Sequence, residues 1–277
     1  MSEALEAPQP QRRRPLVIAH RGASEEEPEH TLRAYRKAFT HGADGVECDV
    51  RLTADQHLVC VHDRRIERTS NGRGVVSALE LARLEELDWA SWKTAHRPGD
   101  TELPDADPER GHLLTLRRLL DTLVGTGQEV VTLIETKHPT RHGGDVEKAL
   151  VHVLRAFDLA DGDLPGRPHV RMMSFSHRAL QRAHKLAPKL PLVYLVDATR
   201  PKWTWDGSLP KGIGAVGLDV RMLRNPKAVR AYQRRGHEVY VWTVDTDDDV
   251  DRCLELGVDV IITNRPAHVL ARVGAAR

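Results

Sequence analysis

The sequence predicts an α/β fold, namely a (β/α)8 TIM barrel with an excursion inserted after the second strand. Eight short apolar runs recur along the 277-residue chain, and nearly all of them are separated by patterns of helical spacing. Alternating βα units of that number, in a chain of that length, favour a closed parallel barrel. A doubly wound open sheet is the alternative that the pattern leaves open.

The predicted strands are short, and helical patterns stand between them. The first helix is predicted from Leu32, Tyr35, Ala38 and Phe39, which recur at helical spacing before Gly42. Further helices are predicted at 114–123, 145–157, 176–186, 226–234, 247–256 and from 266 onward. The strands are predicted at 16–19, 45–50, 129–135, 169–175, 192–196, 215–220, 238–244 and 258–263.

The second strand is predicted to continue into a hairpin. The segment after Asp49 is typical of a strand, a polar turn near Asp55 and a returning valine-rich strand. Because residues equally far from a turn lie opposite each other, His62 is expected to fold back beside Glu47 and Asp49. The residues from about 64 to 111 then form an excursion, turn-rich and polar, with one helical piece at 79–87. Long loops of this kind are often functional.

Composition excludes several classes of protein. Hydrophobic content of 40%, charged content of 29% and a formal net charge of +1 give no electrostatic reason to expect a nucleic-acid partner. No window offers the ~20 apolar residues of a membrane span, so stable membrane insertion is not expected. Residues 1–14 have no apolar core and are interpreted as a disordered lead-in, and residues 15–277 as a single barrel domain.

Cysteine usage indicates a reducing compartment. Cys48, Cys60 and Cys253 are too few and too scattered for a disulfide framework, and an odd count without an export signal favours the cytoplasm. Cys48 and Cys60 fall on the apolar side of their strands, so they are expected to be core thiols.

Two carboxylates on the second strand indicate a metal site. Residues two apart on a strand point to the same face, so Glu47 and Asp49 project together. At a separation of roughly 4 Å and an effective dielectric near 20, they would repel each other by about 4 kcal/mol. A divalent cation removes that repulsion, and ligation by oxygen alone favours Mg²⁺ or Ca²⁺ over zinc.

A third acid and two cations extend the candidate site. Glu135 ends an apolar run and shares a face with Lys137, while His20 and Arg21 end the first strand. Three carboxylates with one divalent cation leave one net negative charge, so an anionic substrate needs further cations, which Arg21 and Lys137 supply. The alternative is that Glu135 and Lys137 merely pair with each other.

In this order the motifs resemble the glycerophosphodiester phosphodiesterase family of the phospholipase-C-like phosphodiesterase superfamily. Any one motif is weak, but the combination is highly specific and spans the chain from Leu16 to Pro266. The matching motifs are His20-Arg21-Gly22, Pro28-Glu29-His30-Thr31, Glu47-x-Asp49, His62-Asp63, Arg68-Thr69-Ser70-Asn71-Gly72, Glu135-x-Lys137, Ser174-Phe175 and Trp242-Thr243-Val244. His30 departs from a usual Asn, and Asn264 from a commoner Asp.

The resemblance implies a hydrolase of lipid and glycerol metabolism that converts glycerophosphodiesters to sn-glycerol 3-phosphate and an alcohol. It implies one divalent cation, a small-molecule substrate, and a set of site residues: Glu47, Asp49 and Glu135 on the metal, His20 and His62 as the acid–base pair, Arg21 and Lys137 on the phosphate, and Trp242 as a substrate wall. Our hypothesis makes His20 the base and His62 the acid, and the reverse assignment is the alternative. The nucleophile is either water or a glycerol hydroxyl, and the sequence does not decide between them.

Other functions are weighed against this one. A lysophospholipase D or phosphoinositide-type lipase on the same barrel needs an apolar patch at the mouth, which the polar segment 97–111 does not offer. A catalytically silent binding barrel is disfavoured because both histidines and all three carboxylates are present. A sugar isomerase explains the acids and the metal, but not the paired histidines with Arg21 and Lys137.

Overall fold

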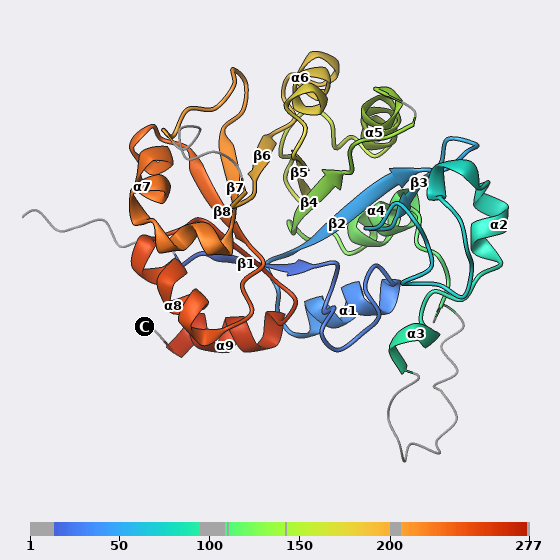
Figure 1. Cartoon of the computed structure of the whole chain (residues 1–277), viewed down its shortest axis with the longest axis horizontal. Helices are drawn as coiled ribbons and strands as arrows, with labels where there is room; N and C mark the ends of the chain where they lie inside the picture. The colour runs from blue at the N-terminus through green and yellow to red at the C-terminus, as the bar shows by residue number, and fades with distance from the viewer. Residues whose placement is uncertain (1–13, 95–108, 110, 142, 200–205, 276–277) are drawn as a thin grey trace, which may run out of the picture.

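Eight parallel strands close into a barrel in the computed structural model, which describes residues 14–94, 109, 111–141, 143–199 and 206–275 (Figure 1). The strand order is β1-β9-β8-β7-β6-β5-β4-β2, and β2 pairs back with β1. Closure excludes the open-sheet alternative and confirms the predicted TIM barrel. The strands are β1 (Leu16–His20), β2 (Gly45–Leu52), β4 (Val131–Thr136), β5 (His169–Ser174), β6 (Leu192–Val196), β7 (Ala215–Asp219), β8 (Glu238–Trp242) and β9 (Val260–Thr263).

Helices cover the outside of the barrel. Figure 1 shows α1, α8 and α9 along one side and α5 and α6 on the opposite side. Threonine or serine caps several of them, as Thr31 does by accepting a bond from the backbone N–H of Ala34. The helices are α1 (Leu32–Thr40), α2 (Leu81–Glu85), α3 (Ser91–Thr94), α4 (Leu116–Gly125), α5 (Asp145–Ala156), α6 (His177–Leu186), α7 (Pro226–Arg234), α8 (Asp247–Leu256) and α9 (Pro266–Ala275), with short 3-10 helices η1 (Val76–Ala78) and η3 (Val220–Arg224).

Alternation along the strands separates packing from chemistry. On the barrel interior, a layer of buried apolar side chains that includes Ile18, Leu133 and Ile262 fills the centre. Two residues farther along the same face of their strands come His20 and Glu135, at the carboxyl ends. The outward faces pack against the helices. The fold thus places a packed apolar layer in the barrel, directly beneath the polar side chains at the carboxyl ends of the strands, which form the mouth of the barrel.

The hairpin after the second strand has the predicted register. Strand β3 (Leu58–Cys60) runs antiparallel to β2 with Val50 opposite Cys60, so the turn is centred on Asp55. The predicted helix at 79–87 is shorter in the structure, where only α2 is α-helical. The reason is that the carbonyl of Leu79 accepts the N–H of Ala54 at 2.9 Å, which holds Leu79 extended.

The excursion has a small core of its own. Val61, Ile66, Val76, Leu84 and Trp89 are buried together beneath it. In Figure 1, β3, α2 and α3 lie at one edge of the molecule, outside the ring of helices. Most of the polar segment 97–111, like the lead-in at 1–13, lies outside the described residues.

Other expectations agree closely with the structure. Each predicted strand begins and ends within two residues of the observed one. Cys48 and Cys60 are buried free thiols, as expected, and Cys253 is buried and free as well. No helix in the described part of the chain has both the length and the apolarity to cross a lipid bilayer.

Candidate active site

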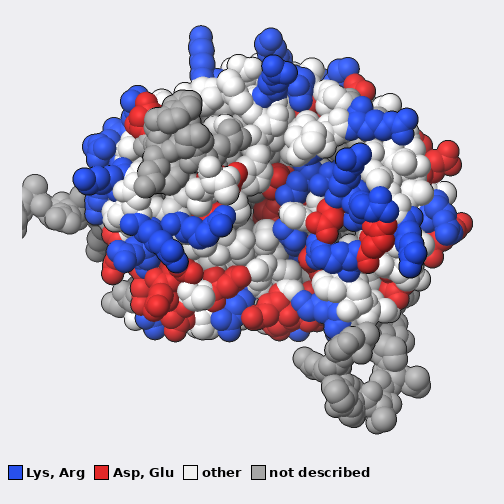
Figure 2. Space-filling model, in the orientation of Figure 1, with Lys and Arg blue, Asp and Glu red and all other residues white. Residues whose placement is uncertain are grey.

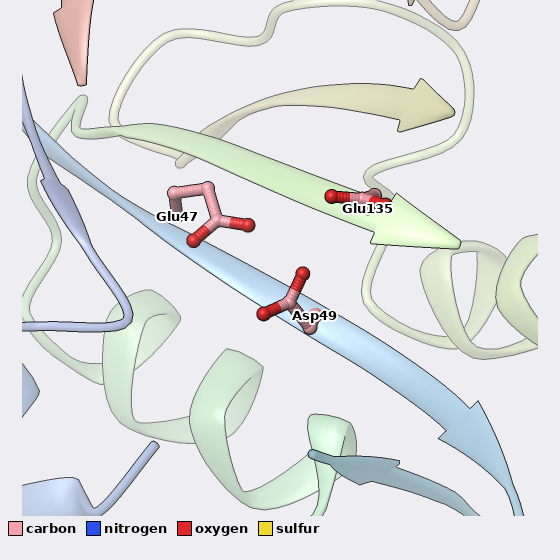
Figure 3. A group of neighbouring side chains, drawn as sticks. All are labelled: Glu47, Asp49 and Glu135. Atoms are coloured by element: carbon pink, nitrogen blue, oxygen red, sulfur yellow. The ribbon is translucent and has the colours of Figure 1, made fainter. Parts of the chain in front are cut away.

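Three buried carboxylates from two neighbouring strands meet at the mouth of the barrel (Figure 3). Glu47 and Asp49 share a face of β2, and the parallel register sets Asp49 beside Glu135 of β4. Their exposed fractions are 2%, 1% and 7%, and one oxygen from each lies within 4.8 Å of the others. The structure therefore brings together the three residues that the sequence predicts as metal ligands.

The chemistry of this donor set fits a hard divalent cation. Burial raises the pKa of Glu47 well above its usual range, and repulsion from Asp49 raises it further. Burial likewise raises the pKa of Glu135 to about 7. Asp49 Oδ1 lies 2.9 Å from Lys137 Nζ, its ion-pair partner. A divalent cation would favour the ionised forms of all three acids, and an all-oxygen donor set suits Mg²⁺ or Ca²⁺.

Arg21 and Lys137, predicted to contact phosphate, lie against the carboxylates. Arg21 Nε is 3.0 Å from Asp49 Oδ2, and its Nη1 donates to Glu29 Oε1 at 3.0 Å. Lys137 Nζ is 2.9 Å from both Asp49 Oδ1 and Glu135 Oε2. The pairing of Glu135 with Lys137 is thus present, within a larger cluster of three acids and two cations. Both cations lie directly against the three carboxylates.

His20 is held in one tautomer by the last strand. Asn264 donates its Nδ2–H to Asp245 Oδ2 at 2.7 Å, so its Oδ1 faces His20 Nδ1, also at 2.7 Å. Nδ1 therefore carries the proton, and the lone pair of Nε2 points toward Glu47 Oε2, 4.0 Å away. Burial, followed by the charge of Arg21, lowers the pKa of His20 to about 3. The sequence marks Asn264 only as a departure from the family pattern; its contact with His20 was missed.

His62 has an anionic partner instead. Its Nδ1 lies 2.7 Å from Asp63 Oδ1, and Asp63 Oδ2 accepts from Arg68 Nε at 2.5 Å. The side chain is 33% exposed, so its Nε2 can reach a bound molecule. Burial lowers the pKa of His62 to about 4, although the charge of Asp49 opposes the change. A carboxylate on Nδ1 stabilises an imidazolium more than the neutral amide on His20 does.

His30 orients a carboxylate of the cluster. Burial lowers the pKa of His30, although its hydrogen bond with Asp49 opposes the change. Its Nε2 lies 3.0 Å from Asp49 Oδ2, and its Nδ1 lies 2.8 Å from the hydroxyl of Tyr35, which donates to the carbonyl of Glu47 at 3.2 Å. The sequence identified position 30 as a departure from the family but assigned it no partner. The structure shows a buried support for Asp49.

Glu29 joins the two halves of the site and has no role in the sequence prediction. Its carboxylate accepts from Arg21 on one side and from both Nη atoms of Arg68, at 2.7 Å each, on the other. Arg68 in turn binds Asp63, the partner of His62. The presence of Glu29 beside His30 in a polar motif was the available signal. One carboxylate therefore links the His62 loop to the metal cluster.

Replacing Glu29 by glutamine should make the free energy of unfolding depend less on pH in the acidic range. Burial alone raises the pKa of Glu29, but hydrogen bonds from Arg68 and the charge of Arg21 outweigh it and lower the pKa from 4.5 to about 2. Its stabilisation is therefore complete above pH 4.5 and disappears as the pH falls toward 2. At about 1.4 kcal/mol per pKa unit, the upper bound is about 3 kcal/mol. Urea unfolding of parent and Glu29→Gln from pH 7 to pH 3 should show the difference shrinking; a constant difference would contradict it.

Aromatic residues form another wall of the mouth. Trp242 ends β8, donates its Nε1–H to the carbonyl of Gly217 at 3.0 Å, and meets Phe175 edge-on at 5.4 Å between ring centres. Asp219 ends β7 and is paired with Arg221, whose Nε donates to Asp219 Oδ1 at 2.9 Å.

Comparison with known proteins identifies the family of the chain. The model of the glycerophosphoryl diester phosphodiesterase family matches residues 20–268. A Mycobacterium tuberculosis protein named "Probable glycerophosphodiester phosphodiesterase 1" is 43% identical, over 93% of this chain and 92% of its own. The glycerophosphodiester phosphodiesterase of Bacillus subtilis is 34% identical, over 91% and 84%. An Oleispira antarctica phosphodiesterase, solved in complex with sn-glycerol-3-phosphate, shares the fold with a TM-score of 0.80 at 24% identity, over 94% and 97%.

Proposed function

The chain belongs to the glycerophosphoryl diester phosphodiesterase family, and we propose that it hydrolyses glycerophosphodiesters to sn-glycerol 3-phosphate and an alcohol at the Glu47, Asp49 and Glu135 cluster. Its reaction class is that of a phosphoric diester hydrolase. The observation that carries the placement is the convergence of three buried carboxylates with oxygens within 4.8 Å, beside two histidines held by different partners.

We propose that the cluster holds one divalent cation, Mg²⁺ or Ca²⁺. When bound, such a cation offsets the charge that develops on the phosphoryl oxygens. Glu47, Asp49 and Glu135 would hold it, and His30 would keep the carboxylate of Asp49 oriented. Arg21 and Lys137 would then turn from the carboxylates to the phosphate oxygens, where a guanidinium gives paired contacts and an ammonium a point charge.

The two histidines would move protons at opposite ends of the reaction. His20 is neutral, with the lone pair on Nε2, so it would take the proton of the attacking hydroxyl as a general base. His62 has Asp63 behind it, and the negative charge of a bound phosphodiester would raise its pKa, so it would donate a proton from Nε2 to the leaving alcohol. Trp242 would form the wall against which the glycerol lies.

The lipase alternative finds no support at the mouth. Among the described residues, the large hydrophobic side chains that are exposed are Leu16 and Leu164. Leu16 begins β1 and Leu164 precedes β5, so both lie toward the amino ends of the strands, away from the site. Neither leucine would give an acyl chain an apolar surface beside these carboxylates. Three buried free thiols support the cytoplasm as the compartment.

Turnover with and without chelator tests this proposal. Purified protein should release sn-glycerol 3-phosphate from glycerophosphocholine and from glycerophosphoglycerol. A chelator should abolish release, and added Mg²⁺ or Ca²⁺ should restore it, because the carboxylates repel one another without a cation. Transient cyclic phosphate in the products would identify a glycerol hydroxyl as the first nucleophile.

Three results would contradict the proposal. Turnover that persists through exhaustive chelation would remove the metal from the reaction. Cleavage of a lysophospholipid, with neither glycerophosphodiester attacked, would favour the lipase, and silence on all three substrates would favour a binding barrel.

A further inference from the structure

A shallow basic pocket adjoins the carboxylate cluster. Four cationic side chains line it, and none of the other lining residues is acidic: Arg51, Arg64, Lys137 and Arg141. Lys137 also contacts Asp49 and Glu135 at 2.9 Å, so this basic pocket and the cluster share a wall. The enclosed part has a volume of only about 20 Å³. Its cations therefore act at an open rim, not at the bottom of a deep cavity.

The four cations come from the end of strand β2 and from two loops at the mouth of the barrel. Arg51 follows Asp49 by two residues and thus shares its face of β2. Arg64 lies in the excursion, where its carbonyl accepts the N–H of Val76 at 3.1 Å. Lys137 and Arg141 lie between β4 and α5. Substrates of barrel enzymes bind at these carboxyl-end loops.

These arginines lack the acidic partners that others on the surface have. Arg65, Arg68, Arg265 and Arg272 each pair with a carboxylate at 2.9 Å or less. Within the described residues, Arg64 and Arg141 are exposed and form no ion pair. Figure 2 shows Lys and Arg gathered beside the central hollow, over the part of the chain where β3 and α2 lie in Figure 1. Their charge is available to a bound anion.

The basic pocket lies on the side of His62. The guanidinium of Arg51 donates twice to the carbonyl of His62, at 2.9 and 2.7 Å, so His62 adjoins the pocket. If His62 protonates the leaving alcohol, that alcohol departs on this side. The aromatic wall at Trp242 stands three strands away around the barrel, on β8. The two ends of the substrate thus meet different surfaces, one aromatic and one basic.

We propose that the basic pocket binds the leaving alcohol and gives the enzyme a preference for glycerophosphodiesters whose alcohol carries a phosphate group. This inference rests on the proposed function. The exposed guanidinium groups of Arg64 and Arg141 supply paired donors for phosphate oxygens, while Arg51 and Lys137 add positive charge. A cationic alcohol such as choline meets repulsion there. The reaction is unchanged: water supplies the hydroxyl, the bond between phosphorus and the alcohol oxygen breaks, and the alcohol leaves with a proton.

A matched pair of substrates tests the basic pocket. Glycerophosphoglycerol and the same diester with a terminal phosphate differ only in the group that should reach these arginines. We expect kcat/KM to favour the phosphorylated diester by roughly tenfold or more, as one or two charged hydrogen bonds would give. The double variant Arg64→Ala, Arg141→Ala should lose this preference and keep its rate on glycerophosphoglycerol. Arg230→Ala, an exposed arginine on α7, is the matched control and should change neither rate.

Several results would overturn the inference. The inference fails if the wild-type enzyme shows no preference between the two substrates. It also fails if the double variant loses rate equally on both, because the arginines then do not distinguish the phosphorylated alcohol. Calorimetric titration in chelator measures binding without turnover, and there the phosphorylated diester should bind wild type more tightly than the double variant. If wild type and the double variant bind the phosphorylated diester equally, the inference is overturned, whether or not the substrates are hydrolysed. If neither substrate is hydrolysed, that result rejects the proposed function and leaves the binding test of the inference intact.

Discussion

The His62→Ala variant should lose about 10²- to 10⁴-fold in kcat on diesters with alkyl alcohols, because the departing alkoxide would then lack a proton donor. A p-nitrophenyl ester of glycerol phosphate has a leaving group that is stable as an anion. On that substrate the same variant should lose less than about tenfold, since the proton from His62 is not needed. Steady-state kinetics on the two substrates measure the difference directly.

Controls separate the acid from general damage to the site. His20→Ala should lose rate equally on both substrates, since a base is required whichever group leaves. His57→Ala changes an exposed histidine in the hairpin turn and should leave both rates unchanged. Equal losses in the His62 variant would mean that His62 is not the acid, and selective losses in the His20 variant would reverse the assignment.

Asp49→Asn should have the largest effect on metal binding. This carboxylate contacts Arg21, His30 and Lys137. Burial raises its pKa, but the charge of Lys137, the hydrogen bond with His30 and the charge of Arg21 outweigh burial and keep the pKa well below the usual range. Removing one charged partner from a buried network costs about 3–5 kcal/mol, or roughly 10²-fold or more in affinity. Titration of Mg²⁺ or Ca²⁺ by calorimetry should show the weakened binding, together with a loss of turnover.

A matched substitution guards this result. Asp55→Asn alters an acid at the tip of the same hairpin, 34% exposed, and should leave metal affinity unchanged. Asp49→Asn binding the cation as tightly as the parent would remove Asp49 from the ligand set, whatever happened to the rate.

The fold and the carboxylates follow from local patterns in the sequence. Strand length, helical spacing and the two-residue repeat suffice to predict eight βα units and to put Glu47 and Asp49 on one face. The hairpin centre at Asp55 follows from the symmetry of its two arms, and the register in the structure has the same centre.

The partners of these residues could not be predicted in the same way. His20 and Asn264 are 244 positions apart, and they meet only because β1 pairs with β9. Glu29 lies between Arg21 and Arg68 because the excursion folds back over the mouth, and no periodicity in the sequence encodes that path. The basic pocket was missed for the same reason, since one strand and two separate loops build it.

The pairing of the first and last strands also means that activity can arise only late in folding. During synthesis, β1 emerges first and β9 last, and until they pair, His20 has no partner to fix its proton. Contacts between residues this far apart in sequence form slowly, because the chain between them loses conformational entropy before the hydrogen bonds of the pairing form. A nascent or partly folded chain would therefore carry every active-site residue on its earlier strands and still lack an oriented base. Activity would therefore appear only when β9 pairs with β1 and the barrel closes, which is when folding is complete.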